Sequence, residues 1–114
     1  MLTAVAIAER LKLVPSEADS RCVTYLLRRP LTIEPVIRPV LNAMDRSVAD
    51  RILFVLRHFR AAVRGLDDLL DASAREPGGR TAAWARFGEA VAAASALRAW
   101  EFAIAAAPDL GSRQ

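Results

Sequence analysis

The spacing of large apolar residues between positions 52 and 70 constrains this chain more than any other feature of its sequence. The steps between them alternate between four and three residues, which is typical of a coiled-coil seam on one side of an α-helix. The stripe consists of Ile52, Leu56, Phe59, Val63, Leu66 and Leu70. We therefore expect one long helix whose stripe is buried against other helices, so that Phe59→Ala would cost about 3 to 5 kcal/mol.

Nine of the eleven glycines and prolines cluster at four places. They cluster at residue 15 and in the ranges 30–39, 77–79 and 108–111. The segments between are rich in Ala, Leu, Arg and Glu, and none alternates apolar and polar residues long enough to form a strand. Because 114 residues are enough for one small domain, we predict an all-α bundle of about five helices over residues 1–108, followed by a flexible C-terminal tail at 109–114.

The two longest helices are predicted in the C-terminal half of the chain. Asp45 or Ser47 would cap the first, over about 46–73, and the second runs over about 82–107. A Pro-Gly-Gly turn between them predicts an antiparallel helical hairpin. Alanines separate the large residues of the second helix, which would let a neighbouring backbone approach closely.

Three shorter helices are predicted before this hairpin, over about 3–13, 15–29 and 32–41. Pro15 suits the first turn of the second helix. Thr32 is the expected cap of the third, and Pro39, which lacks a backbone donor, should kink or restart it.

Five consecutive apolar residues at 52–56 cover every direction around the long helix, and such a segment must be covered on all sides. Either the preceding helices of the same chain or a second chain would cover Leu53 and Phe54. This feature favours a non-enzymatic interaction or oligomerisation protein that acts through its C-terminal hairpin. Its partner would be a copy of itself or another helical protein, with an interface at Leu53, Phe54, Trp84 and Trp100.

DNA binding is an alternative function. The net charge is +3, and the basic excess lies in residues 1–66, which hold 11 basic and 6 acidic residues. The helices at about 3–13 and 15–29 with the turn between them resemble the helix-turn-helix of small bacterial regulators. That resemblance implies that the second helix enters the major groove, with Arg21 nearest the bases and Arg28 and Arg29 near phosphates.

A second alternative rests on the sequence Asp-Asp-Leu-Leu-Asp, which supplies Asp67, Asp68 and Asp71. Carboxylates four residues apart share one helix stripe and can bridge Mg²⁺ ions that hold a diphosphate. This segment resembles the D-D-x-x-D motif of the trans-prenyl diphosphate synthases, and Arg80 with the Arg-Phe-Gly at 86–88 is similar to their downstream elements. The resemblance implies a truncated or accessory subunit that binds Mg-diphosphate at the three aspartates.

Apart from this motif, the sequence contains no pattern typical of a catalytic, metal or cofactor site. His58 is the only histidine and Cys22 the only cysteine, so we predict no catalytic residue, no metal site and no cofactor. The first residues lack the apolar core of a signal peptide, and a lone cysteine cannot form an intramolecular disulfide, so we expect a cytoplasmic protein. The apolar run at 90–107 carries Arg98 and Glu101, so we expect no membrane span.

Overall fold

The computed structural model of this protein describes residues 17–29 and 31–107, and this part of the chain is all-α, which confirms the predicted fold class. It contains five helices: α2 (Glu17–Leu27), α3 (Glu34–Asn42), α4 (Arg46–Leu70), α5 (Ala83–Phe87) and α6 (Glu89–Ala106). The predicted helix at 3–13, the turn that follows it and the tail at 109–114 lie outside the described residues.

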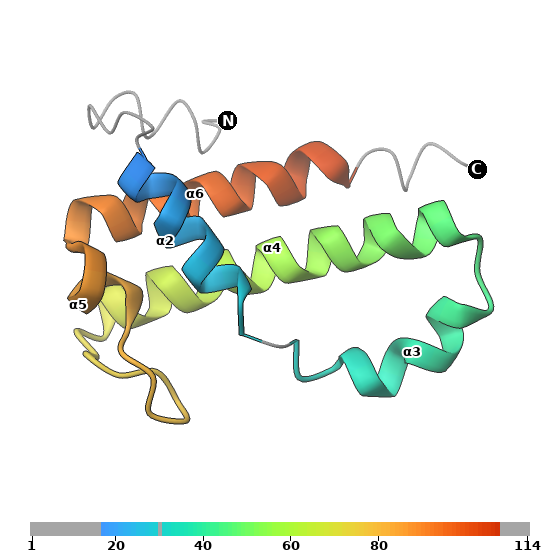
Figure 1. The fold of residues 1–114 in the computed structure, drawn as a ribbon, viewed down its shortest axis with the longest axis horizontal. Helices are drawn as coiled ribbons and strands as arrows, with labels where there is room; N and C mark the ends of the chain where they lie inside the picture. Colours follow the sequence, from blue (N-terminus) through green and yellow to red (C-terminus); the bar gives the residue numbers. More distant parts are fainter. Residues whose placement is uncertain (1–16, 30, 108–114) are drawn as a thin grey trace.

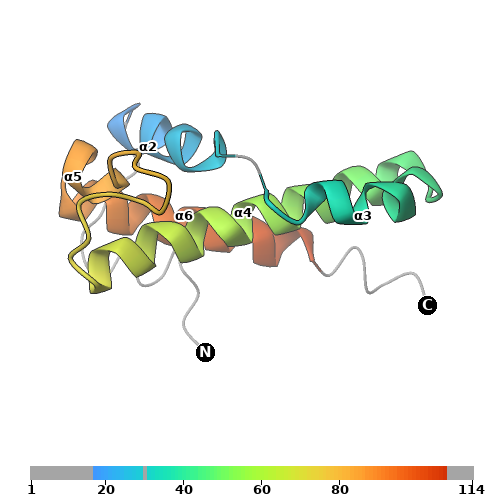
Figure 2. The ribbon, with the colours of Figure 1, turned by 90° about the horizontal axis from the view of Figure 1, so that it is seen from below.

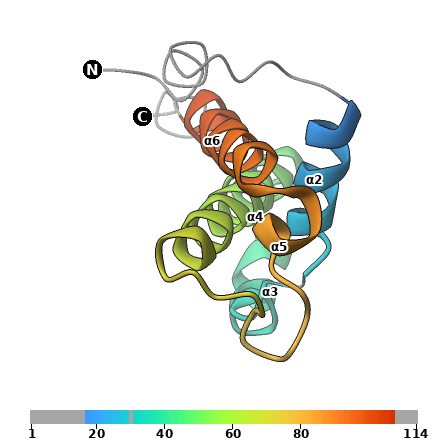
Figure 3. The same ribbon diagram turned by 90° about the vertical axis from the view of Figure 1, so that its left-hand side faces the viewer.

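The helices α4 and α6 run antiparallel and side by side, and they form the predicted hairpin (Figure 1). α2 packs on one side of this hairpin against both of its arms, together with the short α5 (Figure 3). α3 packs along α4 only, near the N-terminal end of that helix (Figure 2). α4 thus takes part in two packing sites, one with α2 and α6 and one with α3. Each site has its own cluster of buried side chains.

The ends of the hairpin arms differ in detail from the prediction. Asp45 caps α4, because its side chain accepts a hydrogen bond of 2.9 Å from the backbone N–H of Ser47. α4 ends at Leu70, before the predicted residue 73, since Ala72 adopts a φ of 52° that no helix continues. The second arm is broken into α5 and α6 at Gly88, whose φ of 93° favours glycine.

The predicted cap of α3 is wrong. Ile33, not Thr32, precedes the helix, and no side chain caps it. α3 continues through Pro39 to its end at Asn42 without a restart. Val36 and Val40 of this helix are exposed.

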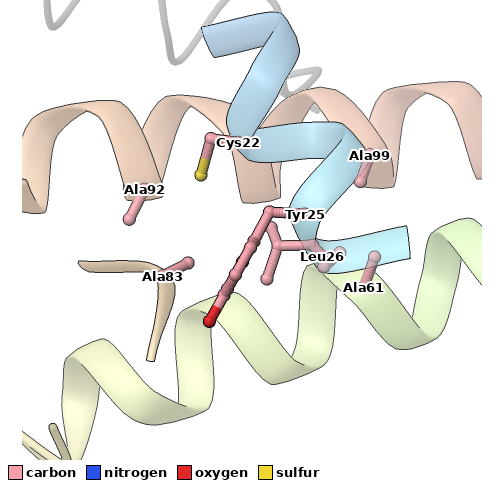
Figure 4. Packing of buried hydrophobic residues seen from close by; sticks show 8 residues of the cluster. Cys22, Tyr25, Leu26, Ala61, Ala83, Ala92 and Ala99 are labelled. Carbon is pink, nitrogen blue, oxygen red and sulfur yellow. The ribbon is translucent and has the colours of Figure 1, made fainter. Parts of the chain in front are cut away.

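The larger core lies where α2, α4 and α6 meet, and small residues line it on the two hairpin arms (Figure 4). Its buried members are Cys22, Tyr25, Leu26, Ala61, Ala62, Ala83, Ala92 and Ala99. Gly65 belongs to the same contact: a Cβ added to it would lie 3.1 Å from Cβ of Ala96 and 3.3 Å from Cδ1 of Leu26. The alanine and glycine surface therefore lets the three backbones approach closely, as expected for the alanines of the second arm.

A smaller core lies between α3 and the beginning of α4. Leu41 of α3 packs there with Ala49 and Leu53 of α4, and Ile37 and Ile52 cover its edge. Leu53 is thus covered by its own chain, which leaves it unavailable as the interface residue that the sequence predicted.

The stripe of large apolar residues on α4 is buried within this chain only in part. Ile52, Leu56 and Leu66 are half-buried, whereas Phe59 and Val63 are 45% and 46% exposed and Leu70 is 85% exposed. The side of α4 that faces α2 carries Ala61 and Gly65 instead. The exposed members of the stripe lie on the outer side of α4, because small residues permit the closer helix contacts on the inner side.

The most apolar helix, α6, contains Arg98 and Glu101. Among the residues that the structure describes, no helix combines the length and the apolar character needed to cross a bilayer.

Candidate functional site

The loop between the hairpin arms folds back on itself and carries Arg75, Glu76 and Arg80. The backbone N–H of Glu76 donates to the carbonyl of Arg80 at 2.7 Å, and the N–H of Ala82 donates to the carbonyl of Ala74 at 2.8 Å. Gly78 and Gly79 form the tip, each with a φ of 98°. These two glycines allow the reversal, since other residues rarely adopt this backbone conformation.

The carboxylate of Glu76 is buried beneath this turn and is held by two arginines. Nε and Nη2 of Arg80 donate to its two oxygens at 2.9 and 2.8 Å, and Nη1 of Arg29 donates at 3.0 Å. The residue is 3% exposed. Burial alone would raise the pKa of Glu76, but the hydrogen bonds and charges of Arg80 and Arg29 outweigh it and lower the pKa below its ordinary value of 4.5.

Arg80 also fixes the turn to α2 through Tyr25. Its Nη1 donates to the backbone carbonyl of Tyr25 at 2.8 Å, and its guanidinium lies 4.0 Å from the centre of the tyrosine ring. The guanidinium of Arg86 lies 4.8 Å from the same ring, and the tyrosine hydroxyl donates to the carbonyl of Thr81. Cation–π contacts and hydrogen bonds therefore join α2, the turn and α5.

A second buried carboxylate, Asp68, pairs with Arg64 on α4. Nη2 and Nε of Arg64 donate to Asp68 at 2.6 and 3.2 Å, and Nη2 also donates to Asp67 at 2.9 Å. The hydrogen bond to Asp68 is the main reason that the pKa of Arg64 is raised above its ordinary value. Asp68 is 2% exposed, so this ion pair is buried on its acidic side.

This geometry separates the three aspartates of the Asp-Asp-Leu-Leu-Asp segment. Asp67 and Asp68 share Arg64, whereas Asp71 is the exposed C-terminal cap of α4. Among the described residues, no group of three or more carboxylate, histidine or cysteine side chains has an arrangement that could hold a metal ion.

Arg60 lies near the same network without a carboxylate of its own. Within the part of the chain that the structure describes, no ion pair or hydrogen bond of its guanidinium is present. Burial and the charge of Arg29 lower the pKa of Arg60, the charge of Glu76 opposes them, and Arg64 and Arg80 add smaller lowering effects. Arg60 therefore lies within the electrostatic field of the arginines and of Glu76.

A cavity of about 330 Å³ opens beside the buried carboxylate. It is lined by Arg28, Arg29, Glu76, Pro77, Gly78 and Arg80. Two of the three residues expected at a nucleic acid, Arg28 and Arg29, thus lie at this cavity, while Arg21 is exposed elsewhere on α2. Sequence reasoning missed the roles of Glu76 and Arg60. The sequence does contain a signal for the first, an acid and an arginine four positions apart across a Pro-Gly-Gly turn.

Two of the remaining interface residues are engaged within the chain. Trp84 is half-buried against the larger core, and its Nε1 donates to the carbonyl of Ser73 at 2.7 Å. Phe54 stacks on His58 with ring centres 3.9 Å apart. Phe54 also lines a groove of about 600 Å³ between the beginning of α4 and the end of α6, where Phe102 faces it.

The fourth interface residue, Trp100, is half-buried, and it packs against the larger core at the edge of a different surface. Its ring centre lies 5.1 Å from that of Phe59, which joins α6 to the seam of α4. Ile104 follows Trp100 by one helical turn and is exposed. We call this surface the outer face of the hairpin, and define it by Phe59, Val63, Leu70, Trp100 and Ile104.

Comparisons with protein-family models, with curated proteins and with solved structures found no match to this chain. Its function is therefore inferred from these surfaces alone.

Proposed function

We propose that this protein is a non-enzymatic helical interaction protein that pairs with a second copy of itself through the outer face of its hairpin. One observation carries the proposal. The seam of α4 has coiled-coil spacing, yet Phe59, Val63 and Leu70 remain exposed along it.

The position of this stripe supports an intermolecular contact. At 100° per residue, Val63 lies about 200° around α4 from Gly65, which contacts Leu26 of α2. The seam thus lies on the side of α4 away from the contact with α2. Single exposed apolar residues are ordinary, but a continuous apolar surface is typical of an interaction site.

The chemistry of the stripe favours a copy of the same chain as the partner. Large apolar side chains at alternating steps of four and three pack well against an identical stripe. A two-fold axis would bring each outer face against its equivalent, because such an interface uses the same patch on both subunits. Two hairpins joined in this way would form a four-helix bundle. The exposed apolar residues of each chain would be covered there by those of the other chain.

The mass of the full chain in solution tests this proposal. Light scattering after size-exclusion chromatography at micromolar concentration should give twice the chain mass. Val63→Glu places a charge in the proposed interface, so it should reduce the mass to that of one chain while the helical content stays constant.

Val36→Glu is the matched control, since it makes the same change at an exposed valine of α3. It should leave the dimer intact. A monomeric wild-type chain, or a Val63→Glu variant that still dimerises, would rule out the outer face as the interface.

A further inference from the structure

We propose that the cavity between Arg28, Arg29 and Arg80 binds the phosphoryl group of a small molecule. The site is independent of the proposed dimer, because none of these residues belongs to the outer face. Its volume of about 330 Å³ is at the lower end of the roughly 300 to 1,000 Å³ typical of small-molecule sites.

The charges around the cavity are unbalanced. Three guanidinium groups line it, from the end of α2 and from the turn, and one carboxylate faces them. The arginines are Arg28, Arg29 and Arg80, and the carboxylate is that of Glu76. A ligand with about two negative charges would complete the balance, and a phosphoryl group carries that charge near pH 7.

Arg28 has no carboxylate partner among the described residues, whereas Arg29 and Arg80 are both held by Glu76. One carboxylate is thus shared by two arginines, and the charge of Arg28 is not offset at the cavity. Arg60 lies outside the lining but near it, because burial and the charge of Arg29 lower its pKa while the charge of Glu76 raises it.

The ion pairs with Glu76 orient the guanidinium groups of Arg29 and Arg80 and still leave donors available for a ligand. Arg29 and Arg80 remain 25% and 29% exposed after they bind the carboxylate. A guanidinium has five N–H donors in a planar fork, so each can also donate to a phosphate oxygen. Because Glu76 fixes both forks, little side-chain freedom would be lost when the ligand binds.

Gly78 keeps the cavity open on the side of the turn. A Cβ at this position would lie 3.4 Å from Nη2 of Arg29, the group that lines the opposite wall. The absence of a side chain here leaves the arginine donors accessible.

The shape of the site favours a small ligand over a nucleic acid. The arginines converge on one concavity instead of following a line of phosphates. Arg21, the exposed arginine seven residues before Arg28, is about 10 Å away along the axis of α2 and does not line the cavity.

Calorimetric titration of the full chain with inorganic pyrophosphate and inorganic phosphate tests the site. Ionic strength is kept constant with NaCl, because salt weakens charge interactions. The wild-type chain should bind, and Arg28→Gln should raise the dissociation constant about tenfold or more, as expected for one charge-assisted hydrogen bond. Arg60→Gln should weaken binding by a smaller factor, because Arg60 does not line the cavity and acts only through its charge.

Arg60→Gln also separates ligand binding from a structural role. Since Arg60 is repelled by its neighbours, its replacement should leave the melting temperature of the unliganded chain unchanged or higher, even though binding is weaker. Circular dichroism confirms that each variant is folded.

Arg21→Gln is the matched control, as it removes an exposed arginine from the same helix. It should change the dissociation constant by less than about twofold, because its charge is far from the cavity. An equal loss in Arg21→Gln and Arg28→Gln would show only diffuse attraction and would overturn the site.

Two further results would also overturn it. One is the absence of binding heat with either anion. The other is binding of a short random-sequence DNA duplex by a chain that binds neither pyrophosphate nor phosphate, which would assign the arginines to a nucleic-acid surface.

Discussion

Leu26 of α2 rests against Gly65 of α4, where a Cβ would come within 3.3 Å of its Cδ1 atom. Cβ of Ala96 on α6 borders the same point at 3.1 Å. The absence of one methyl group thus sets the distance between three helices.

Gly65→Ala should destabilise the protein by roughly 1 to 3 kcal/mol, which is the usual cost of overpacking a core. Chemical denaturation measures this change. Helix propensity alone would give the opposite sign, since alanine in a helix is favoured by about 1 kcal/mol over glycine. A more stable variant would therefore show that the three helices can move apart freely. Ala90→Gly, at an exposed position of α6, calibrates the propensity effect in this protein.

Leu26→Ala should cost about 2 to 5 kcal/mol, because this side chain is almost fully buried in the larger core. Phe59→Ala should cost less than about 2 kcal/mol in the monomer, since nearly half of the side chain is exposed. Both are measured by urea denaturation at low protein concentration. A larger loss of unfolding free energy for Phe59→Ala than for Leu26→Ala would show that Phe59 is a core residue and would contradict its exposed position.

The melting temperature of the wild-type chain should rise with protein concentration, because a dimer gains stability by mass action. The same series on Val63→Glu should give a constant melting temperature. A melting temperature of the wild-type chain that does not depend on concentration would contradict the dimer by a route that does not rely on chromatography.

Glu76→Gln should destabilise the protein at neutral pH by about 1.5 to 3 kcal/mol, since Arg80 and Arg29 would lose hydrogen bonds to a charged partner. Asp50→Asn is the control at an exposed pair, where Asp50 lies 3.5 Å from Arg46. That change should stay within about 0.5 kcal/mol. Equal effects of the two substitutions would mean that the buried pair adds nothing.

The stability of the wild-type chain should also fall with acid in a way that depends on Glu76. The pKa of Glu76 is lowered in the folded state from its ordinary value of 4.5. Its contribution is therefore fully present above about pH 4.5 and is lost as the pH falls through the lower folded value. Glu76→Gln should have a flatter profile between about pH 5 and 3 in a series of urea denaturations. Parallel profiles would contradict the assignment.

The sequence was sufficient to predict the hairpin, because its signals are local. Asp45 caps α4 as expected. Arg64 pairs with Asp68, which lies one helical turn after it. The side of α4 that faces inward could not be read in the same way. Periodicity weights large apolar residues, whereas Ala61 and Gly65 are buried because they are small.

The charged site was predictable only in part. The sequence indicated Arg28 and Arg29 as candidate phosphate-binding residues at the end of a short helix. It did not predict Glu76 as their buried centre, because Arg29 and Glu76 are 47 positions apart and meet only when the turn folds against α2. Contacts of this kind depend on the tertiary fold and not on any spacing in the chain.

The clasp between Tyr25 and Arg80 has a consequence for the order of folding. α2 packs mainly against α4 and α6, and the turn is anchored on α2. The turn can make these contacts only after α2 has packed on the hairpin, so we expect the unit of α2 and the turn to open first at the turn, and the amide hydrogens of the turn to exchange with solvent at least as fast as those of α2. The hairpin, whose arms are adjacent in the chain, can assemble earlier and serve as the template on which this unit closes.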